Sequence, residues 1–174
     1  MCSLAAAFLG AGLVGVFGLA NAQLFRGDFD EKPWAEQQAQ LPAFPIPQNL
    51  IRVNMETMRN FEVAIDGSSI DIGQDGVVRY ILVARSSGGA ENITFEGIRC
   101  DSRERKLYAI GRSDKTWGEV RNPAWTSYAI NPRSYHAELA REFFCPELAI
   151  VLNAAEAARN LRRGGRLREP ILDR

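Results

Sequence analysis

The sequence predicts an α+β fold, in which an antiparallel β-meander of about five strands is backed by one or two C-terminal helices. Between residues 61 and 112, apolar runs with strand periodicity follow one another across turns of only a few residues. After residue 134, apolar residues recur at the three- and four-residue spacing of helices. Turns this short join antiparallel neighbours, because parallel strands need a long crossover between them.

The strands are expected at residues 61–65, 69–72, 77–85, 92–100 and 105–112. Asp-Gly at 66–67, "GQDG" at 73–76 and "SSGG" at 86–89 are the turn signals between them. The run "VVRYILVAR" is apolar on both faces. A strand of this kind is usually central and buried on both sides, so 77–85 is expected in the middle of the sheet.

One strand has an irregular pattern. In residues 92–100 the apolar side switches at Gly97, from the face that holds Ile93 to the face that holds Ile98. A β-bulge at Gly97 would reconcile the two halves. Without such a bulge, Glu96 or Thr94 points inward.

Two helices are expected near the C-terminus, at residues 134–144 and 147–163. Ser134 or Asn131 can cap the first helix, and Gly164-Gly165 ends the second. The apolar stripe expected on the second helix consists of Leu148, Val151, Leu152, Ala155 and Ala158.

The N-terminus has the pattern of a secretory signal peptide. Residues 1–22 carry no charge, are rich in Ala, Gly, Leu, Val and Phe, and end in Ala20-Asn21-Ala22, a small-x-small cleavage site. Cleavage after Ala22 would place the protein in the periplasm. The alternative is an uncleaved membrane anchor formed by residues 4–22.

Removal of that segment removes Cys2 and leaves Cys100 and Cys145 as the two cysteines of the chain. They could form half of a metal site, a reactive thiol pair or a disulfide. Two cysteines with one histidine cannot complete a tetrahedral zinc site, and redox pairs usually lie in a Cys-x-x-Cys turn. Because exported domains form disulfides, the sequence predicts a Cys100–Cys145 disulfide and no metal.

The chain is expected to have four parts: the signal peptide 1–22, an extended Pro-containing arm 23–49, one α+β domain 50–163 and an Arg-rich tail 164–174. Pro42, Pro45 and Pro47 exclude helix from the arm. The arm could lie along the domain as a strap, or serve as a P-x-x-P ligand for a partner.

Composition and motifs point to no reaction. The formal net charge is zero, which argues against nucleic acid as a partner. The nucleophile elbow G-x-S-x-G and a complete phosphate loop are missing from the sequence, and no cofactor is expected. The single histidine, His136, is expected at the surface or in a helix cap. Glu96 beside Arg99, and Glu104 beside Arg105, could be ion pairs or catalytic carboxylates.

Two groups of residues could form binding surfaces. Trp117, Trp125, Tyr108, Arg112 and Arg121 combine aromatic rings with arginine, as binding surfaces do, although ordinary core gives the same pattern. The second group is Arg162, Arg163, Arg166 and Arg168, which could contact an anionic lipid surface. A solvated helix end is the alternative, since arginine there complements the helix dipole.

The runs "DGVVRYILVARSSGGAENITFEGIRC", "KLYAIGRSDKTW" and "YHAELAREFFCP" resemble the cryptic neisserial protein-like family of exported bacterial proteins. The likeness covers roughly residues 30 to 146, so 147–163 and the Arg-rich end lie largely outside it. It implies an exported domain whose matching cysteines are Cys100 and Cys145, and it supplies no catalytic residues. We therefore expect a non-enzymatic envelope protein that binds a protein or another envelope component. The alternative is an enzyme that acts on an envelope component through carboxylates such as Glu96.

Overall fold

The computed structural model describes residues 33–165, and all features below belong to the compact unit that begins at Trp34. One antiparallel sheet holds the strands β1 (Leu50–Val53), β2 (Phe61–Asp66), β3 (Asp71–Ile72), β4 (Val77–Ser86), β5 (Glu91–Arg99), β6 (Glu104–Gly111), β7 (Trp117–Glu119) and β8 (Thr126–Ser127). Their spatial order is β1-β2-β4-β5-β6-β7, with β3 beside β4 and β8 beside β6. The helices follow the sheet in the chain, so the α+β prediction is confirmed. The short strands β1, β7 and β8 were not expected.

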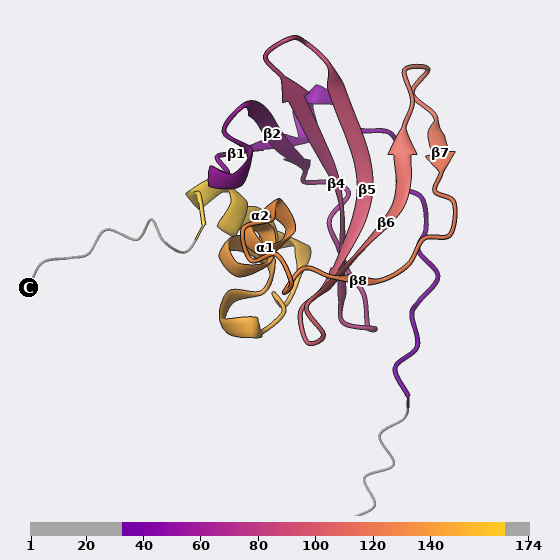
Figure 1. Ribbon diagram of the computed structural model, residues 1–174, viewed down its shortest axis with the longest axis vertical. Helices are drawn as coiled ribbons and strands as arrows, with labels where there is room; N and C mark the ends of the chain where they lie inside the picture. The colour runs from indigo at the N-terminus through magenta and orange to yellow at the C-terminus, as the bar shows by residue number, and fades with distance from the viewer. Residues whose placement is uncertain (1–32, 166–174) are drawn as a thin grey trace, which may run out of the picture. The chain divides into compact units, whose positions relative to one another are not determined.

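Strand β4 lies in the middle of the sheet and is buried along its first eight residues, as its apolar pattern predicted. Its alternate side chains belong to two different cores. Val78 and Tyr80 face the main core, which the C-terminal helices complete. Ile81 and Val83 face a smaller cluster on the opposite side, which residues of the N-terminal arm help to cover. Figure 1 shows the helices and the arm on opposite sides of the sheet.

The same two-sided burial explains the irregular strand β5. Ile98 belongs to the main core and Phe95 to the smaller cluster, so apolar residues are needed on both faces. The register between β5 and β6 shifts between Phe95 and Glu96, and Tyr108 of β6 is the extra residue. The bulge is therefore in β6 rather than at Gly97. Gly97 instead makes room for the bulged tyrosine, because a Cβ there would lie 2.8 Å from Tyr108 Cε2.

The first expected helix is present over its full length, with a change of geometry midway. Helix α1 (Tyr135–Leu139) continues directly into η3 (Ala140–Phe144), a π-helical turn. Ser134 caps the start, since its Oγ accepts a hydrogen bond of 3.2 Å from the backbone N–H of Ala137. Such a cap satisfies one of the donors that a helix start leaves unpaired.

The second expected helix is shorter than the sequence indicated. Helix α2 (Ala154–Arg163) begins after Asn153, whose Oδ1 accepts a 2.9 Å hydrogen bond from the N–H of Glu156. Residues 147–153 are not part of it. The short η4 (Pro146–Leu148) precedes it, with φ of 55° at Glu147 and 68° at Leu148, which a right-handed helix cannot contain. Leu148 and Leu152 are accordingly 56% and 85% exposed.

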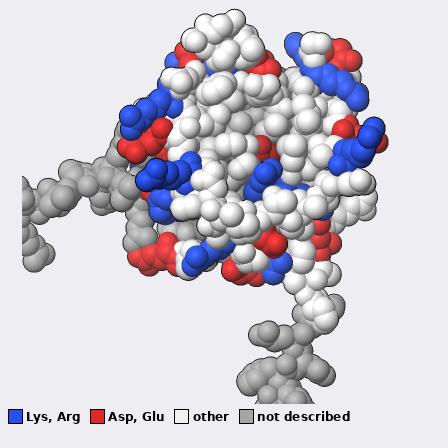
Figure 2. All heavy atoms as spheres, in the orientation of Figure 1, with Lys and Arg blue, Asp and Glu red and all other residues white. Residues whose placement is uncertain are grey.

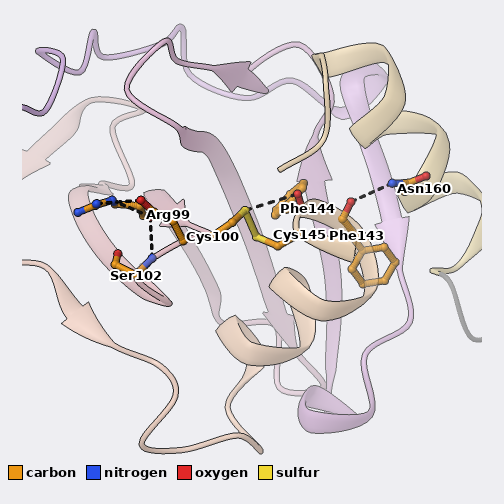
Figure 3. Close-up of a disulfide and its surroundings, with 8 residues drawn as sticks. Arg99, Cys100, Ser102, Phe143, Phe144, Cys145 and Asn160 are labelled. Atoms are coloured by element: carbon orange, nitrogen blue, oxygen red, sulfur yellow. Dashed lines mark hydrogen bonds and ion pairs between the residues drawn. A yellow bond between two sulfur atoms is a disulfide. The ribbon is translucent and has the colours of Figure 1, made fainter. Parts of the chain in front are cut away.

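The predicted Cys100–Cys145 disulfide is present and buried, with the two Cα atoms 5.6 Å apart. It joins the end of β5 to the residue that follows η3 (Figure 3). Beside it, Asn160 of α2 donates a 3.0 Å hydrogen bond to the backbone carbonyl of Phe143. The disulfide and this hydrogen bond fix the end of η3 between the sheet and α2.

Candidate functional site

The strongest polar cluster in the described chain surrounds Glu96, which is 2% exposed. Thr94 and Tyr135 donate hydroxyl hydrogen bonds of 2.7 and 2.9 Å to Oε1. Tyr80 donates one of 2.9 Å to Oε2, and Nε2 of His136 lies 3.2 Å from the same oxygen. Each carboxylate oxygen therefore has two polar partners, and the carboxylate bridges β4, β5 and α1.

These partners keep the carboxylate ionised. Burial alone would raise the pKa of Glu96, but the contact with His136 and the hydroxyl hydrogen bonds outweigh it and lower the pKa. Burial and the nearby Glu96 charge raise the pKa of Tyr80 and of Tyr135, so both hydroxyls remain protonated donors. A carboxylate with both oxygens occupied and a lowered pKa is a poor general acid or base, whose pKa should lie near the working pH.

Two expectations about this region need correction. His136 was expected at the surface or in a cap, but it is 6% exposed and stacks on Tyr135 with ring centroids 3.8 Å apart. Arg99 was considered as a partner of Glu96, but it pairs with Asp101 at 2.8 Å and its guanidinium lies 3.9 Å from the centroid of the Trp34 ring. Alternation along β5 places Arg99 and Glu96 on opposite faces of the sheet.

The arm lies on the face opposite the helices and is bound by part of the predicted aromatic surface. Glu36 of the arm accepts hydrogen bonds from Lys106 (2.7 Å), the Tyr108 hydroxyl (2.9 Å) and Trp125 Nε1 (3.1 Å). Further along, Trp117 Nε1 donates a 2.9 Å hydrogen bond to the carbonyl of Pro42. The three aromatic residues predicted as a binding surface thus contact a segment of their own chain.

A buried ion pair on the same face of the sheet also holds the arm. Arg79 of β4 and Asp75 approach to 2.6 Å, and their side chains are 4% and 1% exposed. Arg79 also donates a 3.0 Å hydrogen bond to the carbonyl of Gln37, whose N–H donates one of 2.8 Å to Asp75. Burial alone would raise the pKa of Asp75, but the hydrogen bonds from Arg79 and Gln37 lower it. This pair therefore positions the arm.

Two arginines of the first predicted surface and two of the second are exposed. Arg112 and Arg121 lie on the loops after β6 and after β7, and Arg162 and Arg163 lie in the last turn of α2. Figure 2 shows basic side chains over the β6–β7 turn. Arg166 and Arg168 lie outside the described residues, and so does the expected signal peptide. Contact with an anionic lipid surface remains a prediction.

An apolar groove of about 520 Å³ lies beside the disulfide. Its lining residues are Arg103, Tyr128, Ala129, Pro132, Ala137, Ala140, Arg141, Glu142, Cys145, Glu147 and Leu148. We call it the disulfide groove. It was not predicted, because it forms where η4 interrupts the expected helix. A volume of this size is typical of binding sites for small molecules or anchoring side chains.

The CNP1-like family matches residues 29–162 of the chain. The chain belongs to the CNP1-like family. The match confirms the resemblance noted in the sequence and corrects its extent, since it includes α2. Comparison with curated proteins and with solved structures found no match.

The part of this CNP1-like chain that the family covers includes the arm from Trp34 onward, the Glu96 cluster, the disulfide and the disulfide groove. None of the helices among residues 33–165 is long and apolar enough to cross a bilayer. In the same range, no three His, Cys, Asp or Glu side chains lie together in a way that could hold a metal ion.

Proposed function

We propose that this protein is an exported, non-enzymatic binding domain of the bacterial envelope, and that it binds an apolar segment of a partner protein in the disulfide groove. The observation that carries the proposal is Leu148. This leucine lines the groove, is 56% exposed, and has a left-handed backbone conformation with φ of 68°.

Such a residue is doubly unfavourable for the isolated fold. The left-handed conformation costs a residue other than glycine about 1–2 kcal/mol, and the exposed side chain recovers little burial energy. Backbone strain of this kind is concentrated at functional sites. A partner that covers Leu148 would bury an apolar side chain that already projects from the surface, at the rim of a preformed groove.

The surroundings of Leu148 suit an apolar partner with a polar rim. Tyr128 is 8% exposed, Ala137 and Ala140 are buried, and all three face the groove. The lining also includes the exposed Arg103 and Arg141 and two acidic residues, Glu142 and Glu147. An apolar centre with a charged rim is the common arrangement of a protein–protein interface.

Export is supported by the disulfide and by the first residues of the sequence. Buried structural disulfides are typical of oxidising compartments such as the periplasm. Residues 1–22 have the composition and the Ala-x-Ala end of a signal peptide. The alternative function, an enzyme working through Glu96, has less support because both oxygens of that carboxylate are already bonded within the fold.

The test uses two exposed leucines of which only one lines the groove. In Leu148→Asn the new asparagine tolerates the left-handed conformation, so the free energy of unfolding of this variant should be within about 1 kcal/mol of that of the parent. Leu152→Asn is the control, because Leu152 is 85% exposed and does not line the groove. Affinity-tagged chains are cross-linked in producing cells, and the products are compared.

We expect one cross-linked species that forms with the parent and with Leu152→Asn and is lost with Leu148→Asn. A species of twice the chain mass would identify a second copy as the partner. Equal products from all three chains would refute the groove as the binding surface. The mass of the accumulated chain tests export separately: it should begin at Gln23, and a chain retaining residues 1–22 would instead be anchored.

A further inference from the structure

A second groove, on the face of the sheet opposite the helices, lies beside the part of the arm that leads into β1. Its volume is about 550 Å³. Phe44 of the arm and Leu50 of β1 form one wall, and Val83 of β4 and Ile93 of β5 form the floor. We call it the arm groove. Its floor continues the smaller apolar cluster, to which Val83, Ile93 and Leu50 belong.

A glycine sets the end of this groove. A Cβ on Gly111 would lie 2.7 Å from Ile93 Cβ and 3.2 Å from Phe44 Cε2. The missing side chain lets the arm and β5 approach each other at this end. The arm groove is therefore built where the arm, β5 and β6 pack closely together.

The rim of the arm groove is positively charged. Three cations line it, Arg85, Arg112 and Lys115, against one carboxylate, Glu91, which gives a formal charge of 3 − 1 = +2. Arg85 and Glu91 form an ion pair with each other. Arg112 and Lys115, both exposed, are left without a carboxylate partner among the lining residues.

A local contact holds Arg112 at the rim. The Arg112 guanidinium donates a 3.2 Å hydrogen bond to the carbonyl of Trp117. Asp114 lies in the same turn but does not line the groove. The Thr116 hydroxyl, which donates a 2.6 Å hydrogen bond to it, and the nearby Arg112 charge lower the pKa of Asp114. Lys115 has φ of 62°, so the turn is tight.

We propose that the arm groove binds a single-chain anionic amphiphile, with its hydrocarbon chain on the Val83 and Ile93 floor and its anionic head between Arg112 and Lys115. The charge at one end and the apolar floor at the other complement the two ends of such a molecule. An extended peptide fits less well. The floor belongs to β4 and β5, and β4 is paired on both sides, so no free strand edge is offered at Val83.

The test is calorimetric titration of sodium dodecanoate, below its micelle concentration, into the protein in the form that producing cells accumulate. We expect saturable one-to-one binding. Arg112→Gln with Lys115→Gln should weaken it about tenfold, because two exposed charge contacts are lost. The matched control, Arg59→Gln with Arg121→Gln, removes two exposed arginines that do not line the groove and should change affinity less than about twofold.

Ligand variation separates the two ends of the site. Acetate, which has the charge without the chain, and dodecyl maltoside, which has the chain with an uncharged sugar head, should each bind at least about tenfold more weakly than dodecanoate. Methyl chemical shifts of Val83 and Ile93 should move on titration, whereas Leu148→Asn should leave the affinity unchanged.

Several results would overturn the proposal. These are absence of saturable dodecanoate binding, equal affinity after neutralisation of Arg112 and Lys115, and binding that is lost in Leu148→Asn. Acetate binding as tightly as dodecanoate would make the site a simple anion site. An acidic hexapeptide competing at equal affinity would assign the groove to peptides instead.

Discussion

Replacing Glu96 by glutamine should destabilise the fold much more than the same replacement of Glu91, the other carboxylate of β5. Glutamine keeps the shape of the side chain but replaces one carboxylate oxygen by an NH₂ group, which cannot accept a hydrogen bond. Whichever way the amide is turned, that NH₂ faces two of the four partners. It meets either the Thr94 and Tyr135 hydroxyls or the Tyr80 hydroxyl and His136.

The magnitude follows from these contacts. Leaving a buried donor without its acceptor costs about 1–3 kcal/mol, so two affected partners cost about 2–6 kcal/mol. The neutral amide avoids the cost of burying a charge, which offsets part of this loss, and the remaining oxygen of the side chain keeps its own contacts. We expect Glu96→Gln to lower the free energy of unfolding by about 2–5 kcal/mol.

Equilibrium unfolding in urea at neutral pH measures this loss, with Glu91→Gln as the matched control. Glu91 lies on the same strand but is exposed, so its substitution should cost less than about 1 kcal/mol. Tyr135→Phe, which removes one donor and leaves the charge, should fall between the two. If Glu96→Gln stays within about 1 kcal/mol of the parent, the cluster is not the structural network that we describe.

Three other perturbations test the remaining supports of the fold. Replacing Cys100 and Cys145 together by alanine should lower unfolding free energy by about 4 kcal/mol, from loop-closure entropy alone, and chemical denaturation measures it. Asp75→Asn should cost about 3–5 kcal/mol and detach the arm, seen as faster amide exchange at Gln37, because Arg79 is left buried without its carboxylate. Acid should destabilise the protein: the pKa of Asp75 and that of Glu96 are lowered by folding, so their contribution is complete above pH 4.5 and is lost as pH falls through the lowered values. Thermal unfolding between neutral pH and pH 3 would contradict this if the midpoint did not fall as the solution was acidified.

The elements that local pattern determines were predictable from the sequence. The run 77–85 is apolar along one whole face and along much of the other, and that pattern favours a central place in an antiparallel sheet. Ser134 and Gly164 mark helix ends through their own backbone preferences, which need no tertiary context. The disulfide could be predicted from the small number of cysteines and from the signal-peptide pattern of residues 1–22.

The Glu96 cluster was not predictable, because its members are separated in the sequence and each has an ordinary local explanation. Thr94 and Glu96 share one face of β5, which is a usable sign, but Tyr80 and His136 reach them only through strand pairing and helix packing. The second helix is shorter than predicted for a related reason. Helical apolar spacing continues through Leu148 and Leu152, so the sequence pattern places Asn153 inside the helix, whereas in the structure Asn153 caps its start.

The two-sided pattern of β4 also explains where the open surfaces lie. A central strand with apolar residues on both faces requires a cover on each side, and the described residues supply helices for one side and the extended arm for the other. The helical cover breaks at Leu148, and Phe44 of the arm lines the arm groove. The disulfide groove lies at the first of these places and the arm groove at the second, so surfaces available to a partner arise where the cover of the sheet is incomplete.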